Sequence, residues 1–249
     1  MLEQMFRNMP GVVKNLLIIN VIMFLATFLL KDLNLLELFG LHYFDSPDFQ
    51  PYQIVTSFFS HANFAHILFN MFGLVMFGAV LERVWGDKKF LIFYLSCALG
   101  ATFIHLGISA IQLHQVFDTF TPVADKLLSI DGNQLSINGQ WIYENKINIT
   151  ESDWGKIKPA YGNLVGASGA ISGLFVAFAY LFPNTELQLM FIPVPVKAKY
   201  LVPFLLLIDL YLGVGNFAWD NIAHFAHLGG ALIGFIMVLI WQRNKSQFY

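Results

Sequence analysis

A serine and a histidine stand out in this chain because each lies beside a long apolar run. Ser168 occurs in Gly166-Ala-Ser168-Gly169, where one apolar segment begins, and His227 lies near the start of another. A histidine that accepts the proton of a serine hydroxyl turns that hydroxyl into a nucleophile, so this pair is sufficient for nucleophilic catalysis. Polar groups are costly in hydrocarbon and are seldom kept there without a function. The question is which elements bring the two residues together.

The composition is that of a membrane protein. Of the 249 residues, 57% are hydrophobic and only 12% are charged, whereas soluble domains carry about 25% charged residues. The net charge of −2 gives no indication of nucleic-acid binding. The single cysteine, Cys97, excludes a disulfide within the chain and a zinc site made of several cysteines.

Six apolar segments approach the length of about 20 residues that crosses ~30 Å of hydrocarbon. They cover roughly residues 14–31, 60–82, 89–112, 166–182, 200–216 and 221–241. No small-residue cleavage site follows the first segment, so we interpret it as an uncleaved span rather than a signal peptide. The sequence predicts an all-α polytopic membrane protein, with six transmembrane helices in a single domain over residues 1–249.

Lysine and arginine predict the orientation of these spans. The side that holds both termini carries nine of them, and the opposite side carries five, four of which lie in one long loop. We therefore expect both termini in the cytoplasm and the chain in a bacterial inner (plasma) membrane. Spans two, four and six then all enter from the outer side.

Residues 113–163 are the least membrane-like stretch of the chain. Asp-Gly and Asn-Gly pairs at residues 131–132 and 138–139 are typical hairpin turns. The flanking residues 127–130, 135–137 and 141–143 are suited to short strands. We predict a small, partly β insertion between spans three and four, outside the cytoplasm and dispensable for the geometry of the serine and histidine. The other outer segment, residues 32–59, carries aromatic residues that suit a loop in the membrane interface.

The polar residues of spans two, four and six are expected at one depth, because these spans run in the same direction. Ser168 and His227 lie near the starts of their spans, and His66 and Asn70 lie four residues apart on one face of span two. From Ser168 to Phe182, both included, span four has only 15 residues. That is about 22 Å of helix, too short for the full hydrocarbon. Span four should therefore begin inside the membrane, beside protein or a water-filled cavity.

Glycines predict that spans four and six touch. His227, Gly230 and Gly234 share one face of span six. Span four has its own small residues: Gly166, Gly169 and Gly173. Small residues let membrane helices approach closely, and such a contact would bring His227 to Ser168.

Each of these features also has a simpler explanation. A serine in a membrane helix commonly bonds its own backbone, a lone histidine commonly packs, and an asparagine such as Asn70 commonly joins helices. Four histidines could suggest a metal or haem site: His61, His66, His224 and His227. No carboxylate or cysteine accompanies them at ligand spacing, so we expect no metal and no other cofactor. The sequence around Ser168 is not a nucleophile elbow, because position 170 is alanine.

Asp209 is a separate candidate, because it lies among leucines within span five. An intramembrane carboxylate is a functional candidate by default, for example in a proton or ion pathway. The alternative is a protonated or hydrogen-bonded residue that only contributes to packing.

Four motifs together resemble the rhomboid family of intramembrane serine proteases over most of the chain. They are His61-Ala-Asn-Phe-Ala-His66-Ile-Leu-Phe-Asn70, Gly78-Ala-Val-Leu-Glu82-Arg-Val-Trp-Gly86, Gly166-Ala-Ser168-Gly169 and Ala226-His227-Leu-Gly-Gly230-Ala-Leu-Ile-Gly234. They occur in the order that the family has, which makes the resemblance specific.

The resemblance implies a six-helix rhomboid-like bundle and a role for each site residue. Ser168 would be the nucleophile and His227 the general base, without an aspartate. The backbone N–H of Ser168, together with His66 and Asn70, would form the oxyanion hole. The partners would be the lipid bilayer and membrane proteins with a transmembrane helix, which the enzyme would cut near its outer end through an acyl-enzyme. Span five and the outer loop 213–222 would form a lateral gate and a cap, with Phe69 beside the gate.

Two departures from the family pattern concern the site. Some members carry Trp-Arg before span two, where this chain has Tyr52-Gln53. Relatives often have an aromatic residue four positions after the serine, where it stacks on the histidine, and this chain has Ser172. The resemblance therefore names no residue that orients His227. A non-catalytic rhomboid-like protein that binds membrane helices is the alternative, although such relatives typically lack the serine or the histidine.

Overall fold

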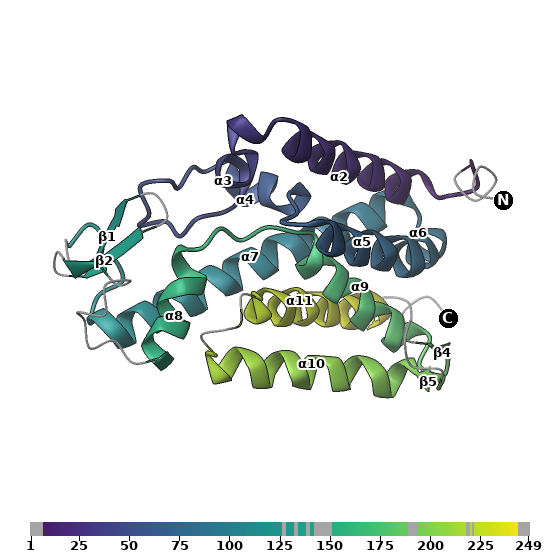
Figure 1. The fold of residues 1–249 in the computed structure, drawn as a ribbon. Coiled ribbons are helices and arrows are strands. Elements are labelled where there is room, and N and C mark those ends of the chain that lie inside the picture. The colour runs from purple at the N-terminus through teal and green to yellow at the C-terminus, as the bar shows by residue number, and fades with distance from the viewer. Residues whose placement is uncertain are drawn as a thin grey trace.

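A computed structural model describes residues 7–125, 128–131, 134–137, 140–141, 151–188, 194–217, 220 and 222–243. Long helices dominate it and pack into one bundle (Figure 1). At one end of the bundle, here called the terminal side, α2 begins and α11 ends. The opposite end, called the entry side, is where α11 begins and where α8 lies with strands β1 and β2 (Figure 1).

The six predicted spans are all present as helices. Among the described residues, five are long and apolar enough to cross a membrane: α2 (Gly11–Leu29), the span Phe64–Trp85, α7 (Asp87–Phe117), α10 (Ala198–Gly215) and α11 (His224–Arg243). The second of these consists of α5 (Phe64–Gly73), a π-helical turn η3 (Leu74–Gly78) and α6 (Ala79–Trp85). The sixth apolar helix, α9 (Ser168–Leu181), has only 14 residues, which is about 21 Å. The short fourth span is therefore confirmed, and it begins at Ser168.

Helix α9 is the central helix of the bundle. It contacts α7, α11, α5 and α10, and most of its side chains are buried. Helix α10 is peripheral in comparison and exposes Phe204, Leu207 and Tyr211. A helix that is apolar on its exposed face suits contact with lipid.

A buried carboxylate fixes the beginning of α2 at the terminal side. Glu82 of α6 is 1% exposed, and its two carboxylate oxygens accept hydrogen bonds from the backbone N–H groups of Val12 at 2.8 Å and Val13 at 2.7 Å. The first N–H groups of a helix have no partner within the helix, and they favour a negative charge. Glu82 thereby joins α2 to the second span.

The segment between α2 and α5 forms short helices rather than a plain interfacial loop. They are η1 (Lys31–Leu33), α3 (Leu35–Phe39), α4 (Gln53–Thr56) and η2 (Ser57–Phe59). Phe44 and Tyr52 are exposed, as an interfacial position requires, but Leu41 and Tyr43 are each 1% exposed. Tyr43 is buried because its hydroxyl donates to the backbone oxygen of Phe120 at 3.1 Å and its ring packs beside Leu113.

The insertion contains the three short strands that the sequence predicted. They are β1 (Leu128–Asp131), β2 (Gln134–Ile137) and β3 (Gln140–Trp141), and they form an antiparallel sheet in the order β1-β2-β3. Leu128 pairs with Ile137, and Ser136 pairs with Trp141. The second residue of the Asp-Gly turn, the whole Asn-Gly turn and the end of the third predicted strand lie outside the described residues.

The sequence did not predict α8 (Glu151–Tyr161), which follows this sheet. Its Gly155 disfavours a helix by intrinsic propensity. The glycine is nevertheless required where it is, because a Cβ there would overlap the backbone oxygen of Asn216 at the end of α10. Ile157 is fully buried beside Leu113 and Tyr43, so the burial of one helix face outweighs propensity.

Asp45 links the segments of the entry side. Its carboxylate accepts from the backbone N–H groups of Val123 at 2.7 Å and Ala124 at 3.2 Å, and from the Tyr161 hydroxyl at 3.3 Å. Burial, and then the neighbouring Asp45, raises the pKa of Tyr161 above its usual value, so the phenol remains a donor.

A small hairpin joins α9 to α10 at the terminal side. It consists of β4 (Glu186–Leu187) and β5 (Val196–Lys197), with Glu186 paired to Lys197. Helix α10 then returns to the entry side beside α11 (Figure 1).

Candidate active site

The structure brings Ser168 and His227 into direct contact. Ser168 is the first residue of α9, and His227 lies in the first turn of α11. The Nε2 atom of His227 lies 2.9 Å from the Oγ atom of Ser168, which is hydrogen-bonding distance. Both residues are half-buried, so the pair lies below the surface of the protein.

The contact depends on close packing of α9 against α11. A Cβ on Gly230 would overlap the backbone oxygen of Gly169, and a Cβ on Gly234 would lie 2.8 Å from the Cα of Gly173. The two helices therefore meet backbone against backbone, as the spacing of their glycines predicted. This packing holds the first turn of α11 beside the first turn of α9.

Gly166 shapes the loop that leads into Ser168. Its φ is +115°, a conformation that L side chains rarely adopt. Its N–H donates to the backbone oxygen of Ser57 at 2.9 Å, and a Cβ on it would lie 2.5 Å from Nε2 of His66. The imidazole of His66 therefore lies directly against the loop, two residues before the serine.

Asn70 lies one turn after His66 on α5 and is 5% exposed. Its side-chain amide donates to the backbone oxygen of His66 at 2.9 Å. An amide nitrogen has two N–H donors, so one remains for another partner. Ile67 and Met71 of the same helix share a core cluster with Ala167 and Ala170, so α5 packs beside the start of α9.

Ser172 does not contact His227 in place of an aromatic residue. Its hydroxyl donates to the backbone oxygen of Ser168, one turn back on α9, at 2.9 Å.

Asp209 of α10 accepts hydrogen bonds from two histidines of α11. Its Oδ1 atom lies 3.2 Å from Nδ1 of His227 and 2.6 Å from Nδ1 of His224. The other ring nitrogen of His224, Nε2, lies 2.8 Å from Oδ2 of Asp220. The structure shows that Asp209 is hydrogen-bonded, and the same contacts make it a neighbour of the candidate active site.

The expectation that no carboxylate accompanies the histidines was wrong, because the carboxylate comes from another helix. One ligand atom from each of Asp209, His224 and His227 lies within 4.8 Å of the others, which resembles the donor set of a metal site. The closest approaches, at 2.6 Å and 3.2 Å, are hydrogen bonds from ring N–H groups to a carboxylate. These two hydrogen bonds explain why the side chains of Asp209, His224 and His227 lie close together.

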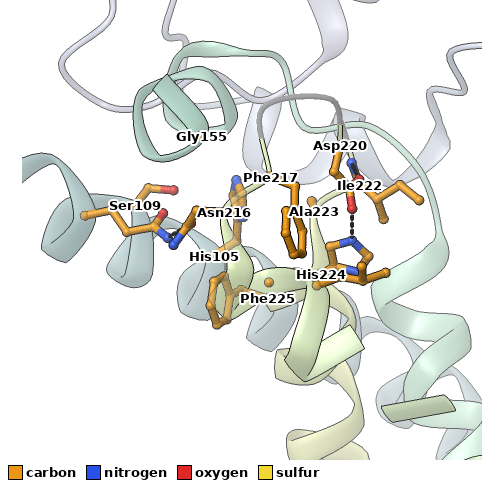
Figure 2. A pocket seen from close by; sticks show the side chains of 13 residues that line it. His105, Ser109, Gly155, Asn216, Phe217, Asp220, Ile222, Ala223, His224 and Phe225 are labelled. Atoms are coloured by element: carbon orange, nitrogen blue, oxygen red, sulfur yellow. Dashed lines mark hydrogen bonds and ion pairs between the residues drawn. The ribbon is translucent and has the colours of Figure 1, made fainter. Parts of the chain in front are cut away.

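A pocket at the entry side reaches the back of this cluster. It is lined from α7, α8, α10 and α11, including His105, Gln112, Gly155, Asn216, Asp220 and His224. Figure 2 shows Asp220 and His224 facing one another at its edge, joined by a hydrogen bond. The Gln112 side chain donates to Asn216 Oδ1 at 2.8 Å, which joins α7 to the end of α10.

His224 and Asp220 were not predicted as partners of the site. Part of their signal was present in the sequence, because His224 and His227 are three residues apart, the spacing of neighbours on one helix face. Asp220 precedes α11, so no helical spacing pointed to it. Only the position of α10 beside α11 reveals that Asp209 joins them.

Several rhomboid proteins resemble this chain in sequence. RHOMBOID-like protein 12, mitochondrial, of Arabidopsis thaliana is 30% identical over 197 residues, which are 78% of this chain and 47% of the relative. Rhomboid protein 1, mitochondrial, of Saccharomyces cerevisiae is 26% identical over 78% of this chain and 42% of its own length. Rhomboid-like protein 16, chloroplastic, of Arabidopsis thaliana is 26% identical over 78% of this chain and 50% of its own length. The chain thus spans about half the length of these curated relatives.

These relatives contradict the expected location. We predicted a bacterial plasma membrane, but the names of the similar proteins place them in mitochondria or chloroplasts. Lysine and arginine counts distinguish the two sides of a membrane. They do not distinguish a bacterial plasma membrane from the membrane of an organelle. The integral membrane character stands.

The model of the rhomboid domain matches residues 48–115 and 139–244, which is more than half of the chain. The matched stretches contain all four motifs, with Ser168 and His227 in the second stretch. Residues 116–138, which include β1 and β2, lie between the two matches. By this match and by its similar proteins, the chain belongs to the rhomboid family.

Proposed function

We propose that this protein is an intramembrane serine endopeptidase that cuts transmembrane helices with a Ser168–His227 pair. The observation that carries the proposal is the distance of 2.9 Å between His227 Nε2 and Ser168 Oγ. It occurs at the first residue of a helix too short to cross the hydrocarbon. The rhomboid family supports a protease-like function within the membrane.

The chemistry would proceed through an acyl-enzyme. The Ser168 oxygen attacks the carbonyl carbon of the scissile peptide bond while its proton passes to Nε2 of His227. The carbon–nitrogen bond then breaks, and the departing amine takes that proton. A water molecule attacks the ester, gives a proton to His227 and releases the carboxyl product, while the proton returns to the Ser168 oxygen.

The developing oxyanion needs donors that are already in position. The Ser168 N–H is one, because the first N–H groups of a helix lack partners within that helix and carry partial positive charge. His66 and the second amide N–H of Asn70 would supply the others. The contact between His66 and the Gly166 loop supports this assignment.

The substrate would be a membrane protein whose helix enters from the lipid near α10 and unwinds at the entry side. Exposed Phe69 of α5 and the exposed apolar residues of α10 support lateral entry. The loop 213–222, proposed as the cap, includes residues outside the described ones. The mitochondrial and chloroplast names of the similar proteins support a membrane of one of these organelles, which fractionation of cells that express the tagged protein would test.

The decisive experiment combines cleavage of a model transmembrane substrate with labelling by a fluorophosphonate probe. Wild-type protein should cleave the substrate and be labelled, and Ser168→Ala and His227→Ala should lose cleavage. Ser172→Ala is the matched control, because it removes a serine hydroxyl one turn away on the same helix; it should keep both activities. Cleavage that survives Ser168→Ala would refute the assignment.

The same experiment separates the enzyme from a non-catalytic helix-binding protein. Purified wild type that binds the substrate, yet neither cleaves it nor reacts with the probe, would favour binding alone.

A further inference from the structure

We propose that Asp209 of α10 is a positioning residue that orients His227 and completes a Ser–His–Asp triad across α9, α10 and α11. The proposal rests on the proposed protease function, and it assigns a residue that the four family motifs do not include. It also answers which residue holds His227, since Ser172 bonds its own helix instead.

The contacts of His227 have the order that a triad requires. Its Nε2 lies 2.9 Å from Ser168 Oγ, and its Nδ1 lies 3.2 Å from Asp209 Oδ1. An ionised carboxylate only accepts hydrogen bonds, so Nδ1 must carry the proton. That leaves Nε2 unprotonated and facing the serine, which is the tautomer that a general base needs. Asp209 thus selects both the tautomer and the orientation of the ring.

A second pair of residues holds Asp209 itself. His224 Nδ1 lies 2.6 Å from Asp209 Oδ1, and His224 Nε2 lies 2.8 Å from Asp220 Oδ2. His224 is 5% exposed and Asp220 8% exposed, so both contacts are shielded from bulk water. With a carboxylate at each ring nitrogen, both nitrogens of His224 donate, which is the doubly protonated form of imidazole.

This arrangement explains how a carboxylate is kept in an apolar helix. A lone carboxylate among leucines is expensive in a membrane protein and requires a partner. His224 supplies the partner, so Asp209 remains an acceptor for His227. When His227 takes the serine proton it becomes a cation, and its bond to Asp209 becomes a charge-assisted one, which is stronger. The hydrogen bond from His227 to Asp209 is therefore stronger in the transition state than in the resting enzyme, and this difference lowers the activation free energy.

The position of Asp209 also links the triad to α10. Ser168 and His227 belong to α9 and α11, which pack backbone against backbone, whereas Asp209 comes from the peripheral α10. Any displacement of α10 away from α11 lengthens the bond between Asp209 and His227 without separating His227 from Ser168. The position of α10 then controls how well the base is oriented.

The test measures kcat and KM of substrate cleavage for Asp209→Asn, which keeps the shape of the side chain and removes its charge. In soluble triad proteases the equivalent change lowers kcat about 10⁴-fold. Here the acceptor oxygen is shared with His224, and we expect a loss of about 10- to 100-fold in kcat with KM changed less than about twofold. Asp220→Asn leaves Asp209 in place and should cost less, about 3- to 10-fold in kcat.

Gln112→Leu is the matched control for structural damage at the same end of α10. It removes the hydrogen bond to Asn216 but no contact of His227, so kcat should stay at the wild-type value. Thermal unfolding of each variant shows whether it folds; if Asp209→Asn does not, Asp220→Asn carries the test.

The outcomes separate this inference from the proposed function. Wild type without cleavage or probe labelling would remove the protease assignment itself. An active wild type with unchanged kcat in both Asp209→Asn and Asp220→Asn would overturn only the triad. If Gln112→Leu lost as much kcat as Asp209→Asn, Asp209 would be a packing residue. If activity required stoichiometric zinc and a chelator abolished it, Asp209, His224 and His227 would be a metal site instead.

Discussion

Gly166 shapes the candidate active site through the side chain that it lacks. Its φ of +115° turns the chain toward Ser168, and the space where a Cβ would stand is occupied by the ring of His66. One residue thus sets the backbone before Ser168, the proposed nucleophile, and the position of His66, a proposed oxyanion donor. At this scale the site depends on single atoms, such as the Nδ1 proton of His227 that Asp209 accepts.

Gly166→Ala should therefore lower kcat by about 100-fold, because a displacement of catalytic groups by about 1 Å costs that much. The added Cβ would stand 2.5 Å from His66 Nε2 and force the ring to move. Gly86→Ala is the matched control: Gly86 also has a positive φ, of +78°, but its Cβ would meet nothing within 4 Å. It introduces similar backbone strain without the clash, and equal losses of kcat in the two variants would contradict the role of His66.

Asn70→Ala should reduce kcat by about 10²- to 10³-fold with little change in KM, the usual loss for one oxyanion donor. The residue is buried at 5% exposure and lies on the face of α5 that packs near the start of α9. Steady-state cleavage of the model substrate gives both constants. A rise in KM alone would instead indicate that Asn70 contributes to substrate binding.

At the scale of elements, the meeting of α9 with α11 brings the serine to the histidine. At Gly230 with Gly169 and at Gly234 with Gly173, the two backbones meet without a side chain between them, and closely packed protein interiors do not readily tolerate added atoms. Helix α10 is held against α11 differently, through the polar contacts of Asp209 with His224 and His227. The structure therefore combines one rigid pair of helices with a more peripheral third.

Gly230→Ala should destabilise the protein by about 1–3 kcal/mol, the usual cost of an overpacked contact. The Cβ would overlap the backbone oxygen of Gly169, and backbone atoms of a helix cannot move aside independently. Thermal unfolding in detergent measures the loss, and cleavage should fall with it as His227 withdraws from Ser168. Gly107→Ala in α7, where a Cβ meets nothing within 4 Å, is the control. Alanine is the better helix former, so this variant should lose no stability and should keep its cleavage.

At the scale of the whole molecule, the insertion and the polar pocket share one side of the bundle with the active site. Helix α8 packs against α7 and reaches the end of α10 through Gly155. Strands β1 and β2 lie farther out (Figure 1). The strand region and α8 are therefore expected to differ in importance. Deletion of the strand region should leave probe labelling of Ser168 intact. Deletion of α8 would expose the buried surfaces of α7 and α10 that it covers.

An even number of spans, together with the lysine and arginine counts, predicts that the segments before the first span and after the last lie on one side of the membrane. Cys97, the single cysteine, is buried, so Cys97→Ala allows new cysteines to report their side. We expect Lys88→Cys, at the terminal side, and Gln115→Cys, at the entry-side end of α7, to react with an impermeant thiol reagent from opposite sides of sealed vesicles. Reaction of both from the same side would contradict the six-span topology.

Much of this protein is determined by local patterns in its sequence. Apolar runs of suitable length define the spans, because hydrocarbon admits little else. The direction of the spans then assigns Ser168 and His227 to one depth, and the shortness of the fourth span follows from counting residues to Phe182. The glycines of spans four and six indicated their contact, since close backbone packing needs small residues.

Only the tertiary structure decided which residues complete the site and its surroundings. Asp209 and His227 are 18 residues apart on different helices, and no periodicity along one helix relates them. Intrinsic propensity likewise did not predict helix α8, because Gly155 disfavours a helix. Its presence is explained only by the close contact with Asn216 in the folded protein. Each span can be recognised by itself, because each must be apolar and long enough to cross the hydrocarbon. The hydrogen-bond partner of a buried polar atom, in contrast, depends on which helices become neighbours in the folded protein.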